Sequence, residues 1–115
     1  MRFPFAAALT FLAACAALPH ATIRTSVEDR VRIDGLSGEE LKLLNEGPDE
    51  LVFELQREKG PPQVVKIGPG LAWGVALEGL RAIIVSHEGE GAGRFSVTVR
   101  GRTGSGIRVV PLPKE

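Results

Sequence analysis

The chain has 115 residues, 43% of them hydrophobic, and its formal charge at neutral pH is zero. This length allows a single domain. The balanced charge argues against nucleic acid as a partner, because a phosphate-binding domain normally carries a clear excess of Lys and Arg.

The N-terminal segment is apolar and follows one basic side chain. Arg2 precedes sixteen residues without a charge, from Phe3 to Leu18. A helix that crosses a bilayer needs about 20 apolar residues, so a membrane span is disfavoured. Pro4 and the apolar character of every face argue against a packed N-terminal helix. A basic start before a short apolar run is typical of a secretory signal, and the sequence therefore predicts export.

The apolar segment includes one cysteine, which follows small apolar residues. Leu12-Ala13-Ala14-Cys15 resembles the lipobox of bacterial lipoprotein precursors, and the resemblance covers these four residues. It implies cleavage before Cys15 and transfer of diacylglycerol to the Cys15 thiol. Two or three acyl chains would anchor the protein stably, since each buried methylene contributes about 0.8 kcal/mol. The expected organisation is a signal peptide over 1–14, a tether over 15–28, a β domain over 29–113 and a tail over 114–115.

Ordinary signal cleavage is the alternative. A cut after Ala21, which makes the leader 1–21, places Pro19 at a position that prefers a small residue, and a cut after Ala17 places Cys15 there. Either cut yields a soluble periplasmic or secreted protein. The single cysteine excludes an internal disulfide by both routes.

The rest of the chain has the pattern of short strands. Apolar and polar residues alternate in runs separated by turn signals about every ten residues, as in Leu51 to Leu55 and Phe95 to Val99. Gly68-Pro69-Gly70 suits a type II turn. We expect an all-β fold, a small antiparallel β-sandwich of about seven or eight strands, similar to immunoglobulin-like or C2-like sandwiches in strand count and turn spacing only. The expected core residues are Trp73, Phe53, Phe95, Val97, Ile83 and Leu55.

Residues 38–46 allow two interpretations. Ser37 and Glu40 have the spacing of a capping box and Gly47 could end a helix, but the helix would have fewer than three turns. The alternation of Leu41 and Leu43 around Lys42 favours a strand.

Candidate catalytic residues are few. His87 is the one histidine beyond the leader and tether, and its neighbour Ser86 would point to the opposite face of a strand. The pattern predicts a solvated loop position for His87 and no enzymatic activity, because hydrolysis would need a nucleophile, a base and an orienting group together.

Metal and phosphate sites are not expected either. His87, Glu88 and Glu90 lack the second histidine or thiolate that a zinc site would use. The oxygen-bearing residues of the 45–50 segment have the wrong spacing for a calcium loop. The glycines of 89–93 precede no helix that could hold a phosphate. The sequence therefore predicts no cofactor.

The C-terminal section is basic. Arg94, Arg100, Arg102 and Arg108 occur with no acidic residue between Gly91 and Lys114. If Ser96, Thr98, Arg100 and Arg102 share the outer face of one strand, they form a cationic stripe that could contact an anion, lipid headgroups or an acidic partner. The alternative is a solvated face balanced by the acidic stretch 39–58.

Two functions fit these patterns. The first is a non-catalytic cell-envelope lipoprotein at the periplasmic face of a bacterial membrane, held through Cys15, with a structural role or a protein partner bound at an exposed strand edge. The second is a soluble module that binds a small ligand or a polysaccharide.

Overall fold

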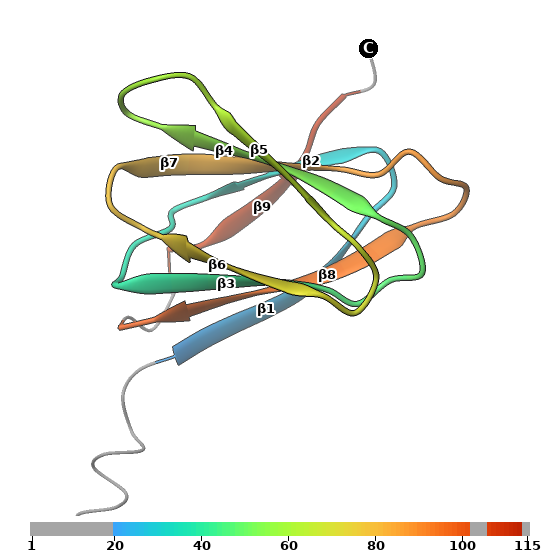
Figure 1. The fold of residues 1–115 in the computed structure, drawn as a ribbon, viewed down its shortest axis with the longest axis horizontal. Coiled ribbons are helices and arrows are strands. Elements are labelled where there is room, and N and C mark those ends of the chain that lie inside the picture. The colour runs from blue at the N-terminus through green and yellow to red at the C-terminus, as the bar shows by residue number, and fades with distance from the viewer. Residues whose placement is uncertain (1–19, 102–105, 114–115) are drawn as a thin grey trace, which may run out of the picture.

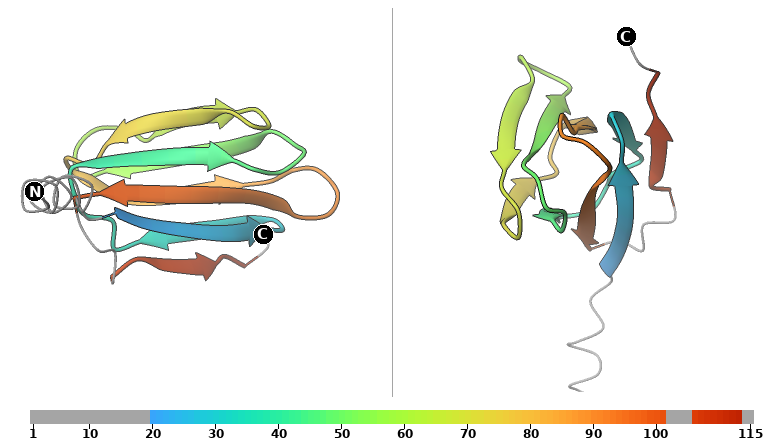
Figure 2. Two further views of the ribbon diagram at one scale, coloured as in Figure 1. Left: turned by 90° about the horizontal axis from the view of Figure 1, so that it is seen from below. Right: turned by 90° about the vertical axis from the view of Figure 1, so that its right-hand side faces the viewer.

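A computed structural model describes residues 20–101 and 106–113 of the chain. Within these ranges the chain forms nine strands and no helix, and therefore no apolar helical segment of membrane-spanning length. The strands build two antiparallel sheets that face each other, so the predicted all-β antiparallel sandwich is confirmed (Figures 1 and 2). The strands are β1 (His20–Val27), β2 (Arg30–Asp34), β3 (Glu40–Asn45), β4 (Leu51–Arg57), β5 (Gln63–Ile67), β6 (Ala72–Ala76), β7 (Leu80–Ser86), β8 (Gly93–Arg100) and β9 (Arg108–Pro111).

The strand order is that of a jelly roll. The first sheet has the order β1-β8-β3-β6 and the second sheet has the order β5-β4-β7-β2-β9. Four pairs are nested like the two arms of one long hairpin: β1 with β8, β2 with β7, β3 with β6, and β4 with β5. Folding this hairpin over itself yields the two sheets. An immunoglobulin-like sandwich pairs its first two strands, whereas β1 and β2 lie in different sheets here.

Alternating side chains fill the space between the sheets. Phe53 of β4 and Phe95 of β8 meet edge to face, with ring centroids 5.7 Å apart. This contact between the sheets is surrounded by leucine, isoleucine and valine side chains from both of them. Five of the six predicted core residues are buried, and Trp73 is the exception.

The sandwich begins earlier than predicted. Residues 20–27, placed in a tether by the sequence analysis, form β1 and pair with β8 along their whole length, from His20 opposite Arg100 to Val27 opposite Gly93. The polar residues that resembled a linker are the outward-facing half of an edge strand. The boundary predicted at residue 29 is therefore corrected to residue 20 within the described chain.

The 38–46 segment contains strand β3, over Glu40–Asn45, and no helix. Leu41 and Leu43 point into the core, and Lys42 points to solvent. Because β3 has neighbours on both sides, β6 and β8, its backbone bonds are satisfied by the sheet and a short helix has no advantage.

A turn of the predicted type leads into β6. The Leu71 N–H donates to the Gly68 carbonyl at 3.1 Å, and Gly70 has a φ of 76°. Both features are those of a type II turn. This turn sets the position of β6 at the margin of the first sheet.

Candidate functional site

The β6 strand forms one margin of the first sheet. In the left panel of Figure 2 it is the yellow strand beside β3, and among the described residues β3 is its only partner. The Asn45 N–H donates to the Leu71 carbonyl at 3.0 Å, just ahead of the strand. Along an antiparallel strand, the N–H and C=O groups of successive residues point alternately to one side and to the other. Those of Trp73 and Val75 therefore point toward β3. Those of Ala72, Gly74 and Ala76 point away from the sheet.

An arginine side chain binds one end of this margin. The Arg57 Nη1 donates to the Ala76 carbonyl at 3.1 Å and to the Glu78 carbonyl at 2.9 Å. These bonds tie the end of β6 to the end of β4 in the second sheet. The open part of the edge is therefore the stretch around Ala72 and Gly74.

The β6 edge is unusual among the four sheet margins in the described part of the chain. Proteins protect edge strands with charged residues or proline, which discourage pairing with another strand. Such residues occur within the three other edge strands: Arg24 in β1, Lys66 in β5, and Arg108 with Pro111 in β9. The β6 strand, Ala72-Trp73-Gly74-Val75-Ala76, has neither.

Gly74 occupies the middle of β6 without a reason internal to the fold. Its φ is not positive, and a Cβ added to it would meet no atom within 4 Å. A glycine inside a strand weakens it, and such a glycine often marks the close approach of another backbone. The position of Gly74 at an unpaired edge points to an approach from outside the described chain.

Apolar side chains accompany this edge. Trp73 faces the second sheet, as Val75 does, but it is 45% exposed because the sandwich is open between β5 and β6. The prediction that Trp73 belongs to the core is therefore wrong in degree: its face is the inner one, but its strand is the last of the sheet. Leu71, just before β6, is 61% exposed. The edge thus offers unpaired backbone groups beside a large apolar surface.

His87 is buried, contrary to the predicted solvated position. Its side chain is 0% exposed, and its Nε2 lies 2.9 Å from the Asp49 Oδ2. The His87 N–H also donates to the Asp29 carbonyl at 2.9 Å. The residue continues the inward-facing set of β7 beyond the end of that strand, so the ring enters the end of the sandwich instead of the loop.

The His87 ring connects the end of β7 to the segment between β3 and β4. With Nε2 donating to Asp49, Nδ1 carries no hydrogen, and it has no hydrogen-bond partner within the described residues. An ionised carboxylate accepts hydrogen bonds and does not donate them, so this contact requires the hydrogen on Nε2. The ring is enclosed by the end of the sandwich.

Asn45 fixes the same end of the molecule. Its Nδ2 donates to the carbonyls of Asp49 at 2.7 Å and Ile67 at 2.8 Å, and its Oδ1 accepts from the Gly47 N–H at 3.0 Å. This side chain, considered above for a calcium loop, is thus satisfied by backbone groups. No cluster of three or more metal-ligating side chains occurs in the described ranges.

The predicted basic residues do not converge where the structure describes them. Arg94 and Arg100 lie on the outer face of β8, about 20 Å apart by strand geometry. Arg100 is 3.5 Å from the Glu40 carboxylate, and Arg108 belongs to β9 in the other sheet. Ser96 and Thr98 lie between Arg94 and Arg100 on the same face, although neighbouring strands bury Ser96. Arg102 and Cys15 are outside the described residues.

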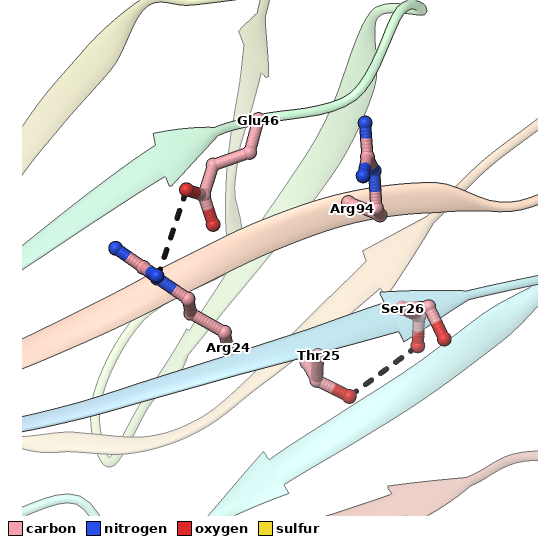
Figure 3. A pocket seen from close by; sticks show the side chains of 5 residues that line it. All are labelled: Arg24, Thr25, Ser26, Glu46 and Arg94. Carbon is pink, nitrogen blue, oxygen red and sulfur yellow. Dashed lines mark hydrogen bonds and ion pairs between the residues drawn. The ribbon is translucent and has the colours of Figure 1, made fainter.

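An open hollow lies beside Arg94 on the first sheet (Figure 3). It has a volume of about 480 Å³ and is lined by Arg24, Thr25, Ser26, Glu46 and Arg94. The Arg24 Nε lies 3.8 Å from the Glu46 carboxylate, which offsets part of the positive charge. Both arginines are exposed, so the hollow is a polar surface and lacks the enclosure of a ligand pocket.

The sequence contained a signal for the β6 edge that the patterns above did not use. A single glycine interrupts the apolar alternation of Trp73 and Val75, and an isolated glycine in a strand pattern suggests a close backbone approach. The burial of His87 has no comparable local signal, because it depends on Asp49, which is distant in sequence.

The fold and this edge define a jelly-roll β-sandwich with one unprotected margin. No protein-family model and no curated protein matches the chain. Among solved structures, the chain is similar to the crystal structure of the Yersinia pseudotuberculosis-derived mitogen. The two are 13% identical with a TM-score of 0.49, over 85% of this chain and 97% of that one.

Proposed function

We propose that the chain is a non-catalytic protein-interaction module that binds an extended segment of a partner along β6. The observation that carries this proposal is the combination of an unpaired edge, free of charge and proline, with a half-exposed tryptophan. Strand addition of this kind gains affinity from backbone hydrogen bonds and specificity from alternate side chains. Trp73 supplies the apolar anchor typical of such interfaces.

We also propose that the module is exported and held at the periplasmic face of a bacterial membrane by an acylated Cys15. The position of β1 argues against the cut after Ala21, and it does not distinguish a cut after Ala17 from one before Cys15. A cut after Ala21 would remove His20 and Ala21, which pair with Arg100 and Val99. A cut before Cys15 leaves β1 whole and places five residues, 15–19, ahead of it. These residues reach at most about 18 Å, so the sandwich would stay close to the membrane surface.

Metabolic labelling with a tagged fatty acid tests the anchor. We expect label on the unmodified chain and none on a Cys15→Ser variant, because the thiol is the acceptor of the first lipid. The labelled protein should fractionate with membranes. An unlabelled, soluble product from the unmodified chain would contradict the anchor and favour the soluble secreted module.

Site-specific photo-crosslinking in living cells tests the interaction at β6. A photoreactive residue at Ala72, beside the open stretch of the edge, should give a discrete protein adduct. The same residue at Val64 is the control, since Val64 is 57% exposed but belongs to the lysine-bearing β5 edge. Adducts of equal yield at both positions, or none at Ala72, would contradict the proposal.

A further inference from the structure

We infer that the strand added to β6 is the β6 of a second copy, so that the two first sheets join into one across a two-fold axis at Gly74. This inference rests on the proposed function, because it names the partner of the same edge. It follows from the register that β6 offers to itself.

The unpaired backbone groups of β6 are self-complementary. Ala72, Gly74 and Ala76 turn their N–H and C=O groups outward, as the ladder to β3 requires. Two such strands placed antiparallel about Gly74 set Gly74 opposite Gly74 of the partner subunit and Ala72 opposite Ala76 of the partner subunit. All three pairs along the strand are then hydrogen-bonded positions. The Ala76 carbonyl keeps a second lone pair for this bond beside the one used by Arg57.

The side chains agree with this register on both faces. The outer face brings together two glycines flanked by alanines, with no bulk and no charge to oppose the approach. On the inner face, Trp73 lies opposite Val75 of the partner subunit, and the indole gains cover from a side chain that its own subunit does not provide. The exposure of Trp73 in the single chain is thus a consequence of the missing strand.

Gly74 fits the axis of such a dimer. Opposed residues of a hydrogen-bonded antiparallel pair have Cα atoms about 5.5 Å apart. Two opposed glycines place no side-chain bulk at this axis, which is compatible with a close approach of the two backbones.

The symmetry is compatible with two anchored copies. Joining two sheets in this way requires a two-fold axis perpendicular to the first sheet. The two β1 strands then start at opposite ends of the dimer but at the same height along the axis. Both tethers can therefore reach one membrane that lies parallel to the sheets.

Engineered cysteines test the register directly in the full chain expressed with its leader. We expect Gly74→Cys to form a disulfide-linked dimer under mild oxidation, because a separation of about 5.5 Å suits a disulfide. The double variant Ala72→Cys with Ala76→Cys should also link. The single Ala72→Cys variant should not, because its two copies would be offset by four residues, about 13 Å, along the strands. The unmodified chain, whose one cysteine is Cys15, is the background control.

The outcomes separate this inference from the proposed function. A product of twice the chain mass in the expected pattern supports the dimer, and equal linking of Ala72→Cys and Gly74→Cys overturns it. If Gly74→Cys does not link, but photo-crosslinking at Ala72 captures a protein of another mass, the second copy is refuted and strand addition stands. If Gly74→Cys forms no disulfide-linked dimer and the photoreactive residue at Ala72 gives no adduct, both proposals fail.

A charge at the axis provides an independent test. Gly74→Lys would place two ammonium groups opposite each other, and like charges directly opposed destabilise a strand pair. We expect at least a tenfold loss of dimer in a chemical-crosslinking assay on membranes, with Gly74→Ala retaining it. The Cβ of either substituted residue would meet no atom within 4 Å in its own chain, so each copy should still fold. An undiminished dimer in Gly74→Lys would overturn the inference.

Discussion

At the scale of single residues, the pair of His87 and Asp49 stabilises the end of the sandwich. Asp49 is 45% exposed, and His87 is enclosed. The two partners therefore differ in what their removal leaves behind. Loss of His87 exposes a carboxylate that water can solvate, whereas loss of Asp49 leaves a buried N–H donor without an acceptor.

Asp49→Ala should therefore destabilise the fold. We expect a loss of about 1 to 2 kcal/mol in the free energy of unfolding, since a buried donor loses its partner. Urea denaturation measures the change. The control is Glu50→Ala, next in the chain and exposed, with a change within about 0.5 kcal/mol. Equal stability of the two variants would show that the hydrogen bond does not contribute.

Two glycines provide a matched comparison of packing. A Cβ added to Gly93 would lie 2.7 Å from the Leu51 Cδ2 and 3.1 Å from the His87 Cδ2. Gly93→Ala should cost about 1 to 3 kcal/mol, because the well-packed end of the core must shift. Gly74→Ala should leave the stability unchanged or raise it slightly. Thermal unfolding of both variants tests this contrast, and a stable Gly93→Ala protein would contradict the packing described for His87.

The burial of His87 could not be predicted from the sequence patterns, and the reason is physical. Its neighbours Glu88 and Gly89 are polar and exposed, which favoured a solvated loop. The ring is buried because Asp49 and Leu51 approach from the β3–β4 connection and the start of β4, about forty positions earlier in the chain. Local composition does not encode such an approach.

At the scale of strands, the contact between Phe53 and Phe95 joins the two sheets at the centre of the core. Phe95→Ala should cost about 3 to 5 kcal/mol, through lost burial and the cavity left behind. Val64→Ala is the control at an exposed strand position, with a change within about 0.5 kcal/mol. Urea denaturation compares the two, and similar midpoints would contradict the central role of the aromatic pair.

Period-two alternation predicted the strands, but it did not predict whether a strand lies at the centre or at the edge of its sheet. Leu41 and Trp73 follow the same rule, since both face the second sheet. Leu41 is covered because β3 is flanked by two strands, and Trp73 is half exposed because β6 is flanked by one. The period of a pattern indicates the face of a residue and does not indicate whether another strand follows.

At the scale of the whole molecule, the nested pairing of strands explains why the strand order could not be predicted from the sequence. The first and last arms of the hairpin bring His20 opposite Arg100, and each inner pair is shorter in sequence than the one outside it. Such distant pairings leave no periodic signature in the chain, whereas turn residues and alternation do. They also predict slow folding, since long loops must close before the pairs form.

The same topology leaves β6 as the margin on which the functional account depends. By the alternation of the ladder, the outward amides of Ala72 and Gly74 have no partner among the described residues, while those of Trp73 and Val75 bond to β3. The central claim is that a second copy pairs with these outward groups.

Hydrogen exchange of the β6 amides at increasing protein concentration tests this claim most directly. Trp73 and Val75 should be protected at every concentration. Gly74 should exchange rapidly in dilute protein and at least tenfold more slowly once the dimer forms. Rapid exchange of Gly74 at all concentrations, or slow exchange already in the dilute single chain, would contradict the account.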